Sequence, residues 1–373
     1  MDHTGCYEGC VWTDIGLLEN FMRDVFIKLG VPQPDAEIVA DVLISADKFG
    51  IDSHGIGRFK LIYVDRIEQG ILNPASVIEI VKETETTAVL DGNNGMGHVI
   101  SKKAMQMAIN KAEKFGTAMT VVRNSSHYGI AGYYSLMCSN SNMIGITGSN
   151  ARPSIAPTFG VENMLGTNPL TIGFPTDEDF PFLIDCATSV AQRGKIEAYA
   201  RAGKELPAGW VIGHDGKTMT NPEKVLKALV EGKASMTPLG GIGEENGGHK
   251  GYGYATAVEV LSAALSDAKY MKDLNGVDEN GKKVPYPLGH FFIAINIKNF
   301  IDPAIFRSIA GNIMRQLRRS EKAEGEDRIY TGGEKEWETW QYRKNHGCPV
   351  PEPLRKQLSE MNSKYGLNYT FPW

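Results

Sequence analysis

The chain has 373 residues, of which 42% are hydrophobic and 22% are charged, a composition ordinary for a globular protein. Its length exceeds the usual limit of one hydrophobic core, so two domains are expected. The formal net charge is −5, with 39 basic and 44 acidic residues mixed along the chain. The one basic cluster, Arg315–Arg319, ends a helical pattern, where cations complement the helix dipole. The charge pattern therefore argues against nucleic-acid binding.

The cysteines indicate a reducing compartment and no structural zinc. They are odd in number and scattered, and no CxxC pair occurs. The five are Cys6, Cys10, Cys138, Cys186 and Cys348. No apolar run approaches the ~20 residues that span a bilayer, and the first ten residues lack the regions of a secretory signal. We expect a cytoplasmic protein with reduced thiols and no metal site.

Helical patterns fill the first 70 residues, with one polar break between them. Residues 13–30 place apolar side chains on one face of a helix that Gly30 closes. A second helix is predicted over residues 35–48 and a third over residues 58–70. The break reads FGIDSHGIGRF, a corner punctuated by glycines.

Strand and helix patterns alternate from residue 76 onward. SVIEIVKE, TTAVLDG, TAMTVV and MIGITGSN are predicted strands, with helices between them at residues 99–116 and in GIAGYYSLMCSNS. This order argues for an α/β layer structure. FLIDCA and HFFIAINIKNF are further predicted strands, and LPAGWVIGHDGKTMT a turn-rich excursion. Helices are expected over residues 188–204, 222–229, 251–268 and 302–320, the third of them largely buried.

A regular dinucleotide-binding fingerprint is missing. The nearest match, GMGHVI at Gly95–Ile100, lacks the third glycine, and no acidic residue ends a second strand about 20 residues later. A turn and helix start is the better interpretation. No P-loop, HExxH zinc helix or GxSxG elbow occurs either.

Two histidines lie in polar corners flanked by glycine. His54 stands in IDSHGIGR and His127 in RNSSHYG, after a predicted strand. Imidazole titrates near neutrality and suits a base that removes an alcohol proton, although many loop histidines only cap a helix. Arg58 follows His54 by four residues, which places both on one helix face. A guanidinium beside an imidazole suits a carboxylate-bearing substrate, with a surface arginine as the alternative.

Four segments resemble backbone that contacts a cofactor. LGTNPL presents Thr167 and Asn168 in a turn, and GGHKGYG presents His249 and Lys250 at a helix entry, where a phosphate could bind. IYTGGE is a further glycine turn. Asp185, which closes the strand FLIDCA, either caps the next helix or holds a ribose. Each signal alone is weak, because glycine turns are common.

Five motifs occur in series and carry a resemblance over residues 13–345. They are IDSHGIGR, RNSSHYGIAGYY, MLGTNPL, LIDCATSVAQRGKI and GGHKGYGYA. Together they resemble the type-2 malate/L-lactate dehydrogenase family, which is unrelated to the Rossmann-fold lactate and malate dehydrogenases. The resemblance implies an NAD(P)-dependent oxidoreductase of small 2-hydroxy acids, usually a homodimer.

The resemblance also implies a fold and a set of site residues. The fold is α/β and L-sulfolactate dehydrogenase-like, with a sheet-based NAD(P)-binding domain at residues 76–290 and a helical domain from residues 1–75 and 291–373. The family's proton acceptor falls on His127, and its substrate-facing corner on Ser53, His54 and Arg58, with His54 as a second candidate for the proton. Family cofactor contacts fall on Asp185, Cys186, Ala187, Lys250, Gly332, Gly333 and Glu334, and one more near Ala151.

The expected reaction is reversible hydride transfer between malate and NAD, with NADP as the alternative cofactor. Arg58 would bind one substrate carboxylate, and Arg152 or Arg193 the other. Lactate, sulfolactate, ureidoglycolate or a cyclic imine are alternative substrates. A non-catalytic binding protein of the same fold is the alternative from another class.

Overall fold

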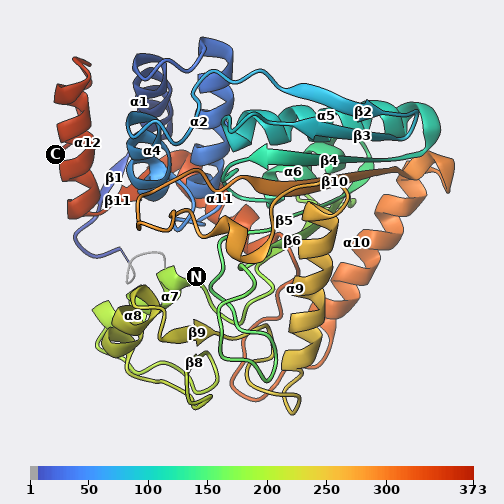
Figure 1. Ribbon diagram of the computed structural model, residues 1–373. Helices are drawn as coiled ribbons and strands as arrows, with labels where there is room; N and C mark the ends of the chain where they lie inside the picture. The colour runs from blue at the N-terminus through green and yellow to red at the C-terminus, as the bar shows by residue number, and fades with distance from the viewer. Residues whose placement is uncertain (1–6) are drawn as a thin grey trace.

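A seven-stranded sheet runs through the middle of the computed structural model, which describes residues 7–373 (Figure 1). The strand order is β2-β3-β4-β10-β5-β6-β7, and among these strands only β3 and β4 are parallel neighbours. The strands are β2 (Glu79–Glu83), β3 (Thr87–Asp91), β4 (Thr117–Ser125), β5 (Met143–Ser149), β6 (Leu170–Phe174), β7 (Phe182–Cys186) and β10 (Leu288–Asn296). A mixed sheet with one parallel pair is not the doubly wound Rossmann sheet, as the missing fingerprint predicted.

The expected domain boundary falls within strand β10. This strand lies between β4 and β5 and pairs antiparallel with both, from Leu288 to Asn296. The boundary placed between residues 290 and 291 would therefore cut a central strand of the sheet, and residues 291–296 belong to the sheet as well. The hydrophobic pattern of β10 predicted a strand but not its neighbours, since strand pairing depends on contacts distant in sequence.

Helices cover both faces of the sheet. Helices α5 (Gly97–Phe115) and α6 (Gly132–Asn140) bury one face, and α9 (Gly248–Ala263) packs on the other against β4, β5 and β10. The expectation that α9 is largely buried is wrong: one side faces the sheet through Ala255 and Val258, whereas Tyr254 and Val260 are exposed.

Both ends of the chain form one helical layer beside the sheet (Figure 1). Its core joins side chains such as Phe21 and Phe59 to Val350 and Leu358. The elements are β1 (Val11–Thr13), α1 (Ile15–Lys28), α2 (Gln33–Lys48), α3 (Ile56–Arg58), η1 (Phe59–Val64), α4 (Asp65–Glu68), α11 (Glu334–His346), β11 (Cys348–Val350) and α12 (Glu352–Lys364). The third predicted helix, 58–70, is interrupted, because η1 is a π-helical turn. Such turns occur frequently at functional sites.

A small lobe with its own core lies below the helical layer in Figure 1. It contains α7 (Arg193–Arg201), β8 (Val211–Gly213), α8 (Pro222–Val230) and β9 (Ala234–Met236). The helix predicted over 188–204 begins only at Arg193, and the turn-rich excursion contains β8. The remaining elements are η2 (Met271–Leu274), η3 (Ile297–Asn299) and α10 (Pro303–Arg319). Within residues 7–373, no helix has the length and apolar character needed to cross a membrane.

Candidate active site

The His127 corner is fixed where β4 ends. The hydroxyl of Ser126 accepts a hydrogen bond from the amide of Gly97 at 2.9 Å and donates one to the carbonyl of Gly95 at 2.8 Å. A Cβ added to Gly97 would lie 2.3 Å from the carbonyl oxygen of Ser126. The glycines of GMGHVI therefore allow the start of α5 to pack against the corner that carries His127.

The His54 corner is built on a buried carboxyl group at the end of α2. Asp47 accepts a hydrogen bond from the amide of Ile56 at 2.8 Å and so caps α3. A Cβ on Gly55 would lie 2.2 Å from a carboxyl oxygen of Asp47, so only glycine fits there without movement. Burial raises the pKa of Asp47 to about 8, above that of an ordinary carboxyl group.

The four residues expected to act on the substrate lie together. The rings of His54 and His127 stack with centroids 5.9 Å apart and an interplanar angle of 22°. Ser53 Oγ lies 2.8 Å from His54 Nδ1, and Arg58 Nε donates to the Ser53 carbonyl at 2.7 Å. One helical turn thus orients both His54 and Arg58 beside His127.

Tyr63 is a contact of His127 that sequence reasoning missed. Its hydroxyl lies 2.6 Å from His127 Nδ1, and the amide of Gly129 donates to the same nitrogen at 3.3 Å. Because a backbone amide can only donate, Nδ1 accepts, and the proton of the neutral ring lies on Nε2. The apolar pattern of FKLIYV gave no signal, since a tyrosine on a helix face normally reads as core.

His98 was missed as well, inside the failed fingerprint. Its ring centroid lies 4.7 Å from that of Tyr63, and neither ring nitrogen has a hydrogen-bond partner among the described residues. Burial alone lowers its pKa to about 3. His98 is therefore a neutral ring that packs behind the Tyr63–His127 pair.

Both corner histidines are neutral near pH 7. Burial lowers the pKa of His127 well below its usual value, and the neighbouring His54, His98, Arg58 and Arg66 lower it further. Burial and then the charge of Arg58 lower the pKa of His54 to about 4. A neutral imidazole can accept an alcohol proton, and the approach of an anionic substrate would oppose the arginine charges that depress its basicity.

Asp185 links the histidine corner to the edge strand β7. One carboxyl oxygen accepts from the amide of Gly132 at 2.7 Å, at the start of α6, and the other from the hydroxyl of Thr171 at 3.0 Å. Burial raises the pKa of Asp185 above the ordinary carboxyl value. Cys186 and Ala187 continue the strand end, and burial raises the pKa of the Cys186 thiol. Asp185 thus contacts the start of α6, an earlier helix, and not the next helix along the chain, α7, as one of the two alternatives expected.

Thr167 and Asn168 lie beside that strand end. The carbonyl of Thr167 accepts from the amide of Thr188 at 2.9 Å, while the Asn168 side-chain amide donates to Glu259 at 2.7 Å. Ala151 lies behind the same turn, because a Cβ on Gly166 would approach its carbonyl to 2.4 Å. The LGTNPL turn thus joins the strand end to α9.

Lys250 and His249 are exposed at the start of α9. The segment before them is joined to the strand end through the amide of Leu239, which donates to the Thr188 carbonyl at 2.8 Å. The first turn of this 16-residue helix suits a phosphate group, because it combines the charge of a lysine with the positive end of the helix dipole. The donor chemistry fits the diphosphate of a dinucleotide.

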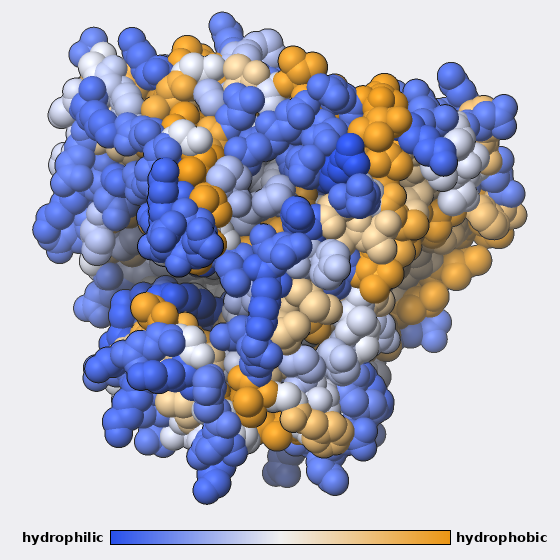
Figure 2. Space-filling view, in the orientation of Figure 1, coloured by the Kyte–Doolittle hydropathy of each residue, from blue (hydrophilic) through white to orange (hydrophobic). Residues whose placement is uncertain are grey.

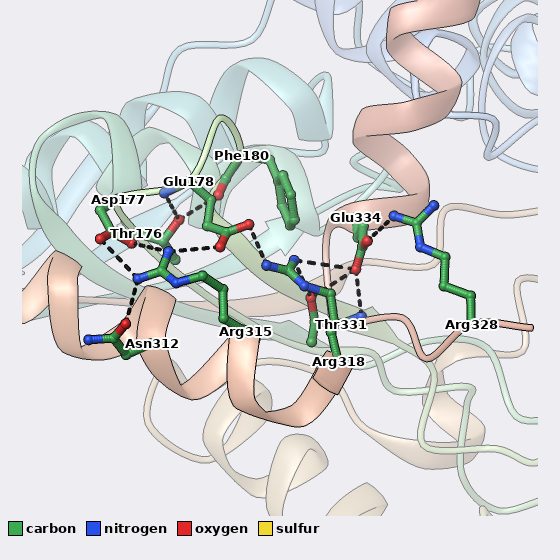
Figure 3. A network of polar contacts seen from close by, with 10 residues as sticks. All are labelled: Thr176, Asp177, Glu178, Phe180, Asn312, Arg315, Arg318, Arg328, Thr331 and Glu334. Atoms are coloured by element: carbon green, nitrogen blue, oxygen red, sulfur yellow. Dashed lines mark hydrogen bonds and ion pairs between the residues drawn. The ribbon is translucent and has the colours of Figure 1, made fainter. Parts of the chain in front are cut away.

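The turn Gly332-Gly333-Glu334 lies against β7, where the amide of Leu183 donates to the carbonyl of Gly332 at 3.4 Å. The carboxylate of Glu334 accepts from the amide of Thr331 at 3.0 Å and lies 3.5 Å from Arg318, and it also pairs with Arg328 (Figure 3). Because the Glu334 carboxylate is already bound to these groups, a cofactor at this turn would contact its backbone atoms.

The basic cluster of α10 completes this ion-pair network. Arg315 contacts Asp177 and Glu178 at 2.9 Å, and Arg318 contacts Glu178 at 2.5 Å (Figure 3). The sequence suggested only that these cations complement the helix dipole, but they also form ion pairs. They join α10 to the loop before β7 and to the glycine turn at the start of α11.

Two neutral histidines beside an arginine, at the end of a mixed sheet, are the arrangement of an enzyme that moves a proton on a small anionic substrate. The model of the malate/L-lactate dehydrogenase family matches residues 14–359, and the chain belongs to that family of oxidoreductases.

Relatives along the whole chain support this assignment. A malate dehydrogenase from Pyrococcus abyssi is 43% identical over 350 residues, 94% of each chain. The structure of malate dehydrogenase from Entamoeba histolytica superposes with a TM-score of 0.94 at 46% identity, covering 98% of this chain and 100% of that one. Sulfolactate dehydrogenase from Methanocaldococcus jannaschii gives a TM-score of 0.85 at 38% identity, covering 96% and 98%. The expected L-sulfolactate dehydrogenase-like fold is confirmed.

Proposed function

We propose that this protein is a malate dehydrogenase that interconverts (S)-malate and oxaloacetate with NAD as cofactor. The observation that carries the proposal is the stacked pair His54–His127 with Arg58 on the same helical turn as His54. The names of relatives at 43% and 46% identity support the choice of malate.

A nicotinamide cofactor, when bound, would supply or accept the hydride at C2 of the substrate. His127 Nε2 faces the substrate oxygen, because Nδ1 is held by Tyr63 and Gly129. Oxidation needs the other neutral tautomer, in which Nδ1 donates its proton to the Tyr63 oxygen and Nε2 is free to accept the hydroxyl proton of the substrate. In reduction, the imidazolium returns the Nε2 proton to the oxygen of the former carbonyl. General acid–base help of this kind contributes on the order of 10²–10⁴-fold.

His54 and Arg58 act on the substrate from the opposite corner. The guanidinium of Arg58 binds the carboxylate next to C2, and its Nε bond to the Ser53 carbonyl fixes its direction. His54, oriented by Ser53, donates to the same carboxylate or to the C2 oxygen. It is the second candidate for the transferred proton.

The cofactor would lie along the end of β7. Asp185, Cys186, Ala187 and the turn at Thr167 and Asn168 would line the nicotinamide ribose, and Lys250 and His249 the diphosphate. The glycine turn 332–334 would contact the remainder of the cofactor through its backbone atoms. We propose NAD, and not NADP, as the cofactor.

A homodimer is the proposed assembly, with α10 as its contact surface. Four side chains spaced four residues apart on α10 are each between 51% and 55% exposed: Ile305, Ile309, Ile313 and Leu317. Figure 2 shows orange patches over this side of the molecule. Exposed apolar patches of this extent usually mark protein contacts. Ile309→Asp should dissociate the dimer in light scattering; a wild-type monomer would refute the assembly.

The cytosol is the proposed compartment, because four cysteines in the described part of the chain are unpaired. The activity is tested by a spectrophotometric panel of 2-oxo acids with NADH and NADPH. Oxaloacetate should oxidise NADH fastest. Turnover only of cyclic imines with NADPH would favour an imine reductase, and no turnover of any substrate would favour a binding protein.

A further inference from the structure

Arg66 is a buried cation for which the described part of the chain provides no anion. Its side chain lies in α4, and the residue is only 6% exposed. Its Nε and Nη2 atoms have no hydrogen-bond partner among the described residues. Burying an unpaired charge is costly, so a protein retains one where something else supplies the opposite charge.

An aromatic ring holds this guanidinium in place. The Arg66 guanidinium carbon lies 3.8 Å from the ring centroid of Tyr286, at stacking distance. Arg152 lies 5.5 Å from the same centroid and is itself exposed. Tyr286 also gives Arg66 a side-chain hydrogen bond, so the stacked ring fixes the plane of the guanidinium, and the unpartnered Nε and Nη2 are left for a ligand.

Arg66 lies next to the histidine pair. It follows Tyr63 by three residues, one helical turn, and the Tyr63 hydroxyl is 2.6 Å from His127 Nδ1. Its charge is also among those that lower the pKa of His127. His127 therefore has two arginines near it, Arg58 from the turn that holds His54 and Arg66 from the turn after Tyr63.

We propose that Arg66, stacked on Tyr286, binds the distal carboxylate of a four-carbon substrate and so selects dicarboxylic over monocarboxylic 2-oxo acids. This inference rests on the proposed function. The two arginines that the sequence suggested for the second carboxylate are less suited to bind it. Arg193 pairs with Glu197 at 3.1 Å, and Arg152, 5.5 Å from the Tyr286 ring centroid, is exposed. A desolvated guanidinium with free donors discriminates more strongly than a solvated one.

The test compares oxaloacetate with pyruvate in wild type, Arg66→Gln and Arg66→Lys. Arg66→Gln should lower kcat/KM for oxaloacetate about 10- to 100-fold, the loss expected for charge-assisted hydrogen bonds, and change the pyruvate value less than about threefold. Arg66→Lys should retain part of the preference. Arg201→Gln, an exposed arginine at the end of α7, serves as the matched control.

Equal losses for both substrates in Arg66→Gln would overturn the proposal, because a structural role acts on both. A selective loss in Arg152→Gln but not in Arg66→Gln would overturn it too. If circular dichroism shows that the Arg66 variants do not fold, Tyr286→Leu is measured instead and should lose oxaloacetate selectively; equal losses there overturn the proposal. If the wild-type enzyme turned over neither substrate, the proposed function itself would be refuted. That outcome differs from a failure of the Arg66 proposal alone, in which the wild-type enzyme is active.

Discussion

Replacing Tyr63 by phenylalanine removes one hydroxyl group from the centre of the site and leaves the ring in place. The hydroxyl lies 2.6 Å from His127 Nδ1, and without it that nitrogen keeps only the longer contact with Gly129, at 3.3 Å. The ring still packs against His98 and Phe26. The loss of one buried hydrogen bond is worth about 1–2 kcal/mol, so kcat should fall about 5- to 30-fold.

The pH profile separates this role from a merely structural one. A hydroxyl that donates to the neutral imidazole favours the neutral form, so its removal raises the pKa of His127. The base must be neutral to accept a proton, and the acid limb of kcat/KM for malate oxidation should therefore move to higher pH. Stopped-flow and steady-state assays with NAD measure both quantities. A Tyr63→Phe enzyme with wild-type kcat and an unmoved acid limb would show that the Tyr63 hydroxyl does not act on His127.

Substitutions at Gly55, Lys250 and His290 test the His54 corner, the cofactor site and the buried core in turn. Gly55→Ala forces a methyl group into Asp47, so stability should fall by about 1–3 kcal/mol in urea unfolding, with kcat/KM reduced; wild-type values would contradict it. Lys250→Ala should weaken NADH binding about tenfold in fluorescence titration at unchanged melting temperature, because Lys250 is exposed; unchanged binding would exclude it from the cofactor site. Burial lowers the folded-state pKa of His290 to about 3, so the unfolded chain takes up its proton first below pH 6.5. Between pH 6.5 and 5 wild type should lose about 2 kcal/mol more stability than His290→Gln, and equal losses would contradict this.

The corner residues could be predicted from the sequence because their signals are local. His54 and Arg58 are four residues apart, and Ser53 is adjacent to His54, so one turn brings all three together. His127 follows a strand, and the end of a strand in an α/β layer is where reactive side chains gather. The helices of residues 15–48 were found for the same reason, because apolar periodicity is a local property.

The supporting residues could not be predicted, because long-range packing places them. Tyr63 meets His127 across 64 residues of sequence, and its own segment is indistinguishable from a core helix. Arg66 is an ordinary charged residue on a helix until Tyr286, 220 residues later, covers it. The π-turn that carries Tyr63 has no periodic pattern of its own.

The expected domain boundary falls inside a strand for a related reason. A strand pattern gives the strand but not its neighbours, and β10 is central because it pairs with Thr117–Ser125 on one side and Met143–Ser149 on the other. The sequence predicted only a helix-dipole role for the basic end of α10, because Arg315 and Arg318 form ion pairs with carboxylates that are distant in sequence.

In the proposed mechanism, His127 carries the proton in a nicotinamide-dependent oxidation of malate. A single-turnover reaction of enzyme preloaded with NADH and mixed with oxaloacetate tests it most directly, in wild type and in His127→Ala. We expect His127→Ala to bind NADH with its normal fluorescence change but to transfer hydride on the order of 10²–10⁴-fold more slowly. A His127→Ala enzyme that transfers hydride at the wild-type rate would contradict it.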